Sequence, residues 1–266
     1  MKNSPIGIFD SGIGGLTIAH SIKELLPNES IIYFGDTKHL PYGEKSAKAI
    51  QEFSKNISDF LKNKNCKAIV IACNSASSVA FDTVKENTNN IEVFNVIGPV
   101  VDYVNENCNN CNIGVIGTKA TISSDIYSEK ILQKNKNQKV NSLATPLLAP
   151  MIEEGFINEE ISKTIIQNYL NNPTLKDINS LILACTHYPL IQKEIEEFYN
   201  NEINVIDSAN IVAKHIKTKL NNLNLLSDTD NSENQFFVSN YTKSFEKSAK
   251  FFFQEEIKLT EINLHQ

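Results

Sequence analysis

Short apolar segments alternate with amphipathic segments along the whole chain, and this alternation restricts the fold more than any other feature. The apolar segments are rich in β-branched and aromatic residues and are bounded by Gly, Asp, Asn or Ser, which is typical of buried strands. Strands are expected at residues 6–9, 31–34, 68–72, 93–97, 112–116, 181–184, 204–206 and 236–239. Strands that alternate with helices predict an α/β fold with mainly parallel sheets.

The segments between the predicted strands carry apolar residues every three or four positions, as the buried face of a helix does. The pattern is clearest at residues 16–26 and 44–62, where Ile50, Phe53 and Ile57 would share one face. After Asp207 the pattern predicts a helix, a strand and another helix, which we expect to return to the first half of the chain.

The two halves of the chain resemble each other weakly. IGIFD at residues 6–10 resembles IGVIG at 113–117, and AIVIACNS at 68–75 resembles SLILACTH at 180–187. We therefore predict two similar, pseudo-symmetric α/β domains, residues 1–97 plus 208–266 and residues 98–207. Because ligands of such folds bind at the carboxyl ends of strands, the active site is expected in the cleft between the domains.

Each half of the chain ends a buried strand in a cysteine, Cys73 or Cys185. Either residue alone is more simply a small core residue, but facing halves would place both thiols across one cleft. Racemisation at an α-carbon needs a base on one face and an acid on the other, and a thiolate and a thiol can exchange these roles. Thiols suit the task because their pKa, about 8.5 without perturbation, can be tuned toward neutrality. The pair predicts an amino-acid racemase without a cofactor, since no lysine has a comparable context for a pyridoxal Schiff base.

Loops at the predicted strand ends supply further candidates. The glycine-rich turn at residues 9–15 can bind an anion through its amides, but it matches neither the dinucleotide fingerprint nor the P-loop. Asp10 in this turn is either a helix-capping acid or a catalytic group. Tyr42 and Gly43 either present backbone donors to a ligand or form a simple turn.

The second half offers a corresponding set of polar residues. His187 follows Cys185 closely, so its imidazolium could stabilise a thiolate or bind a carboxylate. Thr118 and Thr121 either hold a carboxylate or cap the following helix. Glu153 either assists His187 and Cys185 or is a solvated turn acid.

The other cysteines, Cys66, Cys108 and Cys111, receive no role. An odd total of five cysteines without an export signal indicates a reducing compartment, so all five are expected to be thiols. Cys108 and Cys111 form a C-x-x-C pair, but the second ligand pair of a zinc site is missing. No metal is therefore expected.

Charge and hydropathy exclude some classes of protein. The chain carries 25 basic and 31 acidic residues, a net charge of −6, which argues against a nucleic-acid-binding surface. No apolar run has the length of a membrane span, and the first residues do not resemble a signal peptide. We expect a cytoplasmic protein with a small-molecule partner.

Several motifs are similar to those of the glutamate racemases of bacterial cell-wall synthesis, within the aspartate/glutamate racemase superfamily. They are FDSGIGG (9–15), PYG (41–43), ACNSAS (72–77), GTKAT (117–121), MIEEG (151–155) and ACTHYP (184–189), and they occur in the family's order. The resemblance implies that D-glutamate is made for peptidoglycan, with Cys73 on the D-glutamate face and Cys185 on the L-glutamate face. Asp10 would assist Cys73, and Glu153 and His187 would assist Cys185. The residues implied to bind substrate or tune the thiols are Asp10, Ser11, Tyr42, Gly43, Asn74, Ser75, Thr118, Thr121, Thr186 and His187.

Three positions depart from the family pattern, and other functions stay open. Ser75 replaces a usual Thr, Val100 alters a common turn, and Thr145 replaces a frequent Cys, but no assigned chemical group is lost. Aspartate racemase is the nearest alternative. A Cys–His hydrolase would leave Cys73 unexplained, and a non-catalytic binding protein would not need both thiols. The resemblance leaves a homodimer open.

Overall fold

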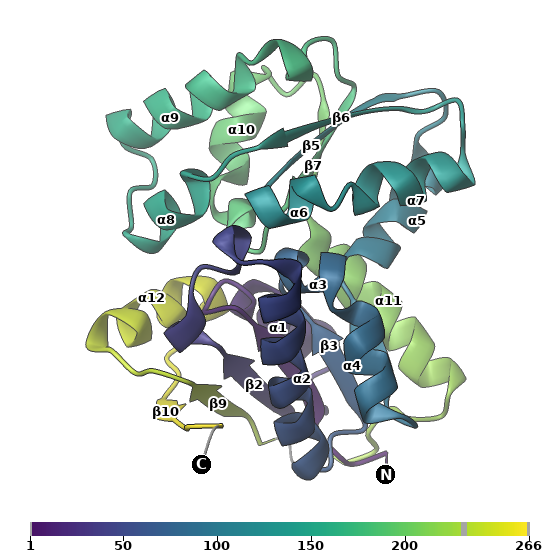
Figure 1. The fold of residues 1–266 in the computed structure, drawn as a ribbon, viewed down its shortest axis with the longest axis vertical. Helices are drawn as coiled ribbons and strands as arrows, with labels where there is room; N and C mark the ends of the chain where they lie inside the picture. The colour runs from purple at the N-terminus through teal and green to yellow at the C-terminus, as the bar shows by residue number, and fades with distance from the viewer. Residues whose placement is uncertain (1, 230–232, 265–266) are drawn as a thin grey trace.

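The strands form two separate sheets in the computed structural model, which describes residues 2–229 and 233–264 (Figure 1). In the first sheet the order is β10 (Leu259–Glu261), β9 (Gln235–Val238), β2 (Ile31–Gly35), β1 (Ile6–Asp10), β3 (Ala68–Ile71) and β4 (Glu92–Asn95). In the second sheet it is β6 (Lys139–Ala144), β5 (Asn112–Gly117), β7 (Ser180–Ala184) and β8 (Asn204–Ile206). Every pairing between neighbours is parallel. The predicted α/β class with parallel sheets is confirmed.

The central strands β1, β2, β3 and β7 are buried along their whole length. Parallel strands covered on both faces need apolar side chains on both, which explains their continuous apolar sequences. The order β2-β1-β3-β4 in the first sheet corresponds to β6-β5-β7-β8 in the second. The internal repeat in the sequence thus matches β1 to β5 and β3 to β7.

Helices surround each sheet, and we call each sheet with its helices a lobe (Figure 1). The first lobe contains α1 (Leu16–Leu25), α2 (Ala47–Asn63), α3 (Asn74–Val79), α4 (Phe81–Thr88), α11 (Ser208–Asn222) and α12 (Lys243–Phe253). The second contains α6 (Lys119–Ser123), α7 (Ile126–Lys134), α8 (Leu148–Glu153), α9 (Glu160–Leu170) and α10 (Gln192–Phe198). The helix α5 (Ile97–Asn107) packs on both α11 and α7 and so joins the lobes. Short 3₁₀ turns lie at Thr37–His39, Tyr42–Glu44, Pro173–Leu175 and Tyr188–Ile191.

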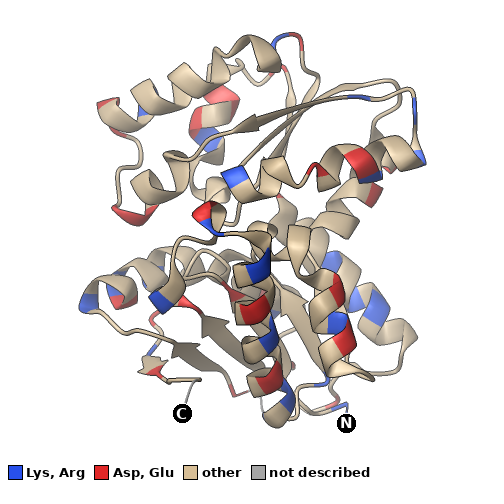
Figure 2. Ribbon diagram, viewed as in Figure 1, with Lys and Arg blue, Asp and Glu red and all other residues tan. Residues whose placement is uncertain are grey.

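The helix α2 illustrates how local sequence sets an element. Ser46 caps its N-terminus by accepting a hydrogen bond from the backbone of Ala49 at 3.3 Å. Ile50, Ile57 and Leu61 then recur on one face and are buried. In the view of Figure 2, acidic and basic residues are interspersed along several of the helices. None of the helices in the described segments is long and apolar enough to span a membrane.

Three expectations about the elements need correction. The strand expected at residues 93–97 ends at Asn95, whose side chain accepts hydrogen bonds from the amides of Ile97 and Gly98 and starts α5 instead. The strand β6 was not predicted because it is an edge strand whose side chains are only partly buried. The strand β10 was also not predicted, since its sequence LTE has no apolar run. The proposed domain boundaries themselves stay a prediction.

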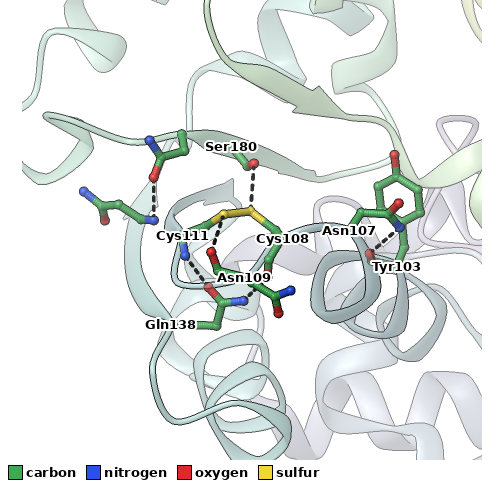
Figure 3. Close-up of a disulfide and its surroundings, with 9 residues drawn as sticks. Tyr103, Asn107, Cys108, Asn109, Cys111, Gln138 and Ser180 are labelled. Carbon is green, nitrogen blue, oxygen red and sulfur yellow. Dashed lines mark hydrogen bonds between the residues drawn. A yellow bond between two sulfur atoms is a disulfide. The ribbon is translucent and has the colours of Figure 1, made fainter.

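The expectation that all cysteines are thiols is wrong for Cys108 and Cys111, which form a disulfide (Figure 3). Cys108 ends α5, and the chain turns at Asn110, which has a φ of 58°, so that Cys111 returns beside it before β5. The side chain of Gln138 binds both backbones of the pair. Composition cannot reveal such a local turn. The disulfide lies at the amino end of β5, at the opposite edge of the sheet from Cys185. The other three cysteines, Cys66, Cys73 and Cys185, are not disulfide-bonded.

Candidate active site

Both strand-end cysteines face one cavity between the lobes. Cys73 follows β3 and Cys185 follows β7, and the water-accessible volume of the cavity is about 40 Å³. The predicted residues that line it are Ser11, Tyr42, Gly43, Cys73, Asn74, Ser75, Thr118, Glu153, Cys185, Thr186 and His187. The carboxyl ends of parallel strands in two facing lobes thus create one site, as the repeat predicts.

Cys73 is a buried thiol at the N-terminus of α3. Its Sγ accepts a hydrogen bond from the amide of Ala76 at 3.4 Å and lies 3.7 Å from Oγ of Ser11. Burial, and next the charge of Asp10, raise the pKa of Cys73 to about 12. Cys73 therefore holds its proton at neutral pH.

Asp10 lies behind the cavity wall rather than in it. Its Oδ2 accepts hydrogen bonds from the amides of Gly12 and Gly15, both at 3.1 Å, and so holds the glycine-rich turn. Burial raises the pKa of Asp10, although His187 and the turn amides lower it. Its other oxygen is buried and has no partner among the residues that the structure describes. Gly15 is required here, because a Cβ at this position would come within 2.5 Å of the Asp10 side chain.

Cys185 has a cationic partner. Its Sγ lies 3.7 Å from Nδ1 of His187, whose Nε2 lies 2.8 Å from Oε1 of Glu153. Burial alone would lower the pKa of His187, but its hydrogen bonds with Cys185 and Glu153 hold that pKa well above the usual value. His187 is therefore an imidazolium at neutral pH, placed between the Cys185 sulfur and the side chain of Glu153. The ring of Phe252 packs edge-on against it, with centroids 5.2 Å apart.

The loop that carries Tyr42 and Gly43 lines the cavity. The hydroxyl of Tyr42 donates to Asp36 at 2.6 Å, and Asp36 also accepts from Ser239 at 2.7 Å. Burial and Asp36 raise the pKa of Tyr42, so its phenol stays protonated. A Cβ on Gly43 would come within 2.7 Å of Thr118, so only glycine lets the loop approach the second lobe this closely.

A cluster of hydroxyls joins the lobes at the same cavity. Oγ of Ser75 lies 2.8 Å from Oγ1 of Thr118 and 3.4 Å from Oγ1 of Thr121. Thr118 also caps α6 by accepting from the amide of Thr121 at 3.3 Å. Thr121 is buried behind Thr118 and does not line the cavity. The cluster offers uncharged donors to a carboxylate.

Comparison with known proteins identifies the family of this chain. The family model described as Asp/Glu/Hydantoin racemase matches residues 13–216. The chain belongs to this racemase family. It is 40% identical to glutamate racemase 3 of Caldanaerobacter subterraneus over 97% of this chain and 93% of the relative, and 37% identical to the glutamate racemase of Chlorobaculum parvum over 97% and 96%. The resemblance seen in the motifs and the predicted enzyme class, an amino-acid racemase, are confirmed.

Solved racemase structures share the fold of this chain to different extents. The crystal structure of the Francisella tularensis glutamate racemase in complex with D-glutamate matches with a TM-score of 0.94 and 40% identity, over 100% of this chain and 99% of that one. The aspartate racemase of Picrophilus torridus matches with a TM-score of 0.57 and 22% identity, over 82% and 94%, and so shares the fold alone.

Sequence reasoning about this racemase missed part of its site. Leu40, Pro41, Ala149 and Pro150 line the cavity, and nothing in their residue types indicates it. Tyr127 was also missed, because it lies inside an ordinary helical pattern and only the packing of the lobes brings it to Asn74. The motifs thus predicted most of the polar residues that line the cavity and missed several of its apolar ones.

Proposed function

We propose that this chain is a cofactor-independent glutamate racemase, in which Cys73 exchanges the α-proton of D-glutamate and Cys185 that of L-glutamate. The observation that carries the proposal is the pair of thiols, one from each lobe, on a single cavity. The nearest alternative from the sequence analysis, an aspartate racemase, has less support, since the Picrophilus torridus aspartate racemase shares only the fold with this chain. Each lobe supplies one acid–base group, in keeping with the proposed domains 1–97 plus 208–266 and 98–207.

Conversion of L-glutamate begins with proton removal by a Cys185 thiolate. The Cys73 thiol then delivers its proton to the opposite face of the same carbon, so that Cys185 ends as a thiol and Cys73 as a thiolate. The sulfurs exchange protonation states through solvent before the next turnover, and the reaction needs no oxidant or reductant. The reverse sequence converts D-glutamate.

The surrounding groups stabilise the charges in these steps. The His187 imidazolium neutralises a thiolate at Cys185, and Glu153 keeps His187 protonated. Donors such as Asn74 and Thr186 bind the α-carboxylate, where negative charge grows when the α-proton leaves. The hydroxyls of Ser75 and Thr118 suit the second carboxylate of glutamate. The product D-glutamate supplies peptidoglycan synthesis in the cytoplasm.

The proposal is tested by following the circular dichroism of L-glutamate incubated with the protein in the presence of EDTA. We expect the signal to decay to zero, with no effect of a carbonyl-trapping reagent, while L-aspartate in a parallel sample keeps its signal. A stable glutamate signal, or faster decay with aspartate, would contradict the proposed substrate. Loss of activity with the carbonyl reagent would contradict the proposed mechanism.

A further inference from the structure

Asn74, next to Cys73, has one side-chain atom paired and the other unpaired. Its Oδ1 accepts a hydrogen bond of 2.7 Å from the hydroxyl of Tyr127. Its Nδ2 is buried and has no partner in the described part of the chain, although Asn74 is only 2% exposed and lines the cavity. A buried amide group that carries an unused donor is costly unless a ligand accepts from it. The Asn74 amide therefore has a donor left for an acceptor in the cavity.

Tyr127 reaches Asn74 from the other lobe. It lies in the first turn of α7, is 2% exposed, and is separated from Asn74 by 53 positions in the sequence. Burial, and next the charge of Cys185, raise the pKa of Tyr127, so its hydroxyl remains a donor. The hydrogen bond thus spans the two lobes, from the one that carries Cys185 to the residue that follows Cys73.

The direction of this hydrogen bond decides what Asn74 presents to the cavity. If the amide were turned over, Nδ2 would donate to the Tyr127 oxygen, and the hydroxyl hydrogen of Tyr127 would lose its acceptor. Oδ1 would then face the cavity and repel a carboxylate. With Tyr127 donating, the amide presents N–H, which a carboxylate can accept.

We propose that Tyr127 is a positioning residue for racemisation, whose hydroxyl orients the Asn74 amide so that Nδ2 donates to a carboxylate oxygen of the bound amino acid. The inference rests on the proposed function and deepens it, because it accounts for a residue outside all of the site motifs. Tyr127 does not touch the substrate. It acts through Asn74 alone.

The test compares steady-state kinetics of glutamate racemisation in Tyr127→Phe and the wild type. The variant keeps the buried ring and loses only the hydroxyl, so we expect KM for both enantiomers to rise roughly tenfold, the loss typical of one hydrogen bond to a charged group, with a smaller change in kcat. Tyr199→Phe is the matched control. The Tyr199 hydroxyl is also buried, in the second lobe, and has no partner within residues 2–229 and 233–264, so its removal should leave KM unchanged.

A double-mutant cycle with Asn74→Ala separates positioning from a general packing effect. In the Asn74→Ala background, the further change Tyr127→Phe should alter KM by less than twofold. A full tenfold loss in that background, or an unchanged KM in the single variant Tyr127→Phe, would overturn the inference. The wild-type assay separates failure of the proposed function from failure of this inference. If the wild type leaves the circular dichroism of L-glutamate unchanged, both are contradicted. If the wild type is active but Tyr127→Phe has an unchanged KM, only the inference is contradicted.

Discussion

The two halves of the site hold the same residue at the same place in the fold, yet they surround it with opposite charges. Cys73 and Cys185 each follow the third strand of a corresponding strand set, β3 and β7. Beside Cys73 stands the carboxylate of Asp10, which together with burial raises the pKa of that thiol to about 12. Beside Cys185 stands the His187 imidazolium. The repeat in the fold sets where the sulfurs lie, while unrelated neighbours set the charge that stands beside each sulfur.

Removal of either thiol should produce the largest effect and tests whether the halves work on opposite faces. We expect Cys73→Ala and Cys185→Ala each to lower racemisation roughly 10³-fold or more, because each removes one of two obligatory proton carriers. NMR in D₂O should then show α-proton exchange confined to one enantiomer, D-glutamate in Cys185→Ala and L-glutamate in Cys73→Ala. Equal exchange of both enantiomers in either variant would show that the thiols do not divide the two faces.

Removal of the His187 imidazolium should affect only the half of the site that holds Cys185. We expect His187→Gln to lower kcat about 10²-fold, since a thiolate at Cys185 loses its neutralising partner. The pKa of His187 is raised, so the imidazolium persists above the usual His range and is lost only as the pH rises through this raised value. Wild-type activity should therefore not decline between pH 6 and pH 7.5. A decline centred near the usual value of about 6.5 would contradict a protonated His187.

Glu153→Gln tests the charge on His187 in a second way, with a smaller expected fall in kcat. The hydrogen bond that His187 donates to Glu153 is one of the interactions that raise the pKa of His187, so loss of the Glu153 charge should make His187 easier to deprotonate. We expect kcat to fall roughly tenfold and the alkaline limb of the pH–kcat profile to move to lower pH. A matched change at Glu154, the exposed neighbour, should leave both unaltered. An unmoved alkaline limb in Glu153→Gln would separate Glu153 from the titration of His187.

Asp10→Asn tests the Cys73 side through stability. The raised pKa of Asp10 means that folding favours its protonated form, so the stability it contributes is present below the unfolded value of 3.8 and is lost as pH rises through the folded pKa. The neutral amide should therefore raise the unfolding midpoint by about 2–4 °C at pH 7, and the gain should shrink toward pH 4. Calorimetry at both pH values measures it. A lower midpoint at pH 7 would indicate that the Asp10 charge is stabilising in the folded protein.

Much of the architecture was predictable from local sequence. Buried parallel strands carry continuous apolar runs, so most strands were found to within one or two residues. The matched Cys73 and Cys185 motifs predicted two similar halves and the edge of each sheet where the cavity lies. The edge strand β6 was not predicted, because a half-exposed strand does not need a continuous apolar run.

The sequence by itself determined the alternation of strands and helices, the repeat, and the residue types that stand at the strand ends, since each of these depends on the chemistry of neighbouring residues. Only the tertiary structure decided that Asp10 holds the glycine-rich turn from behind the cavity wall, that Cys108 and Cys111 are joined, and that Tyr127 donates to Asn74. Those outcomes depend on which groups become buried side by side. Burial, and pairing such as that of Tyr127 with Asn74 across 53 positions, leave no trace in the local pattern of residues.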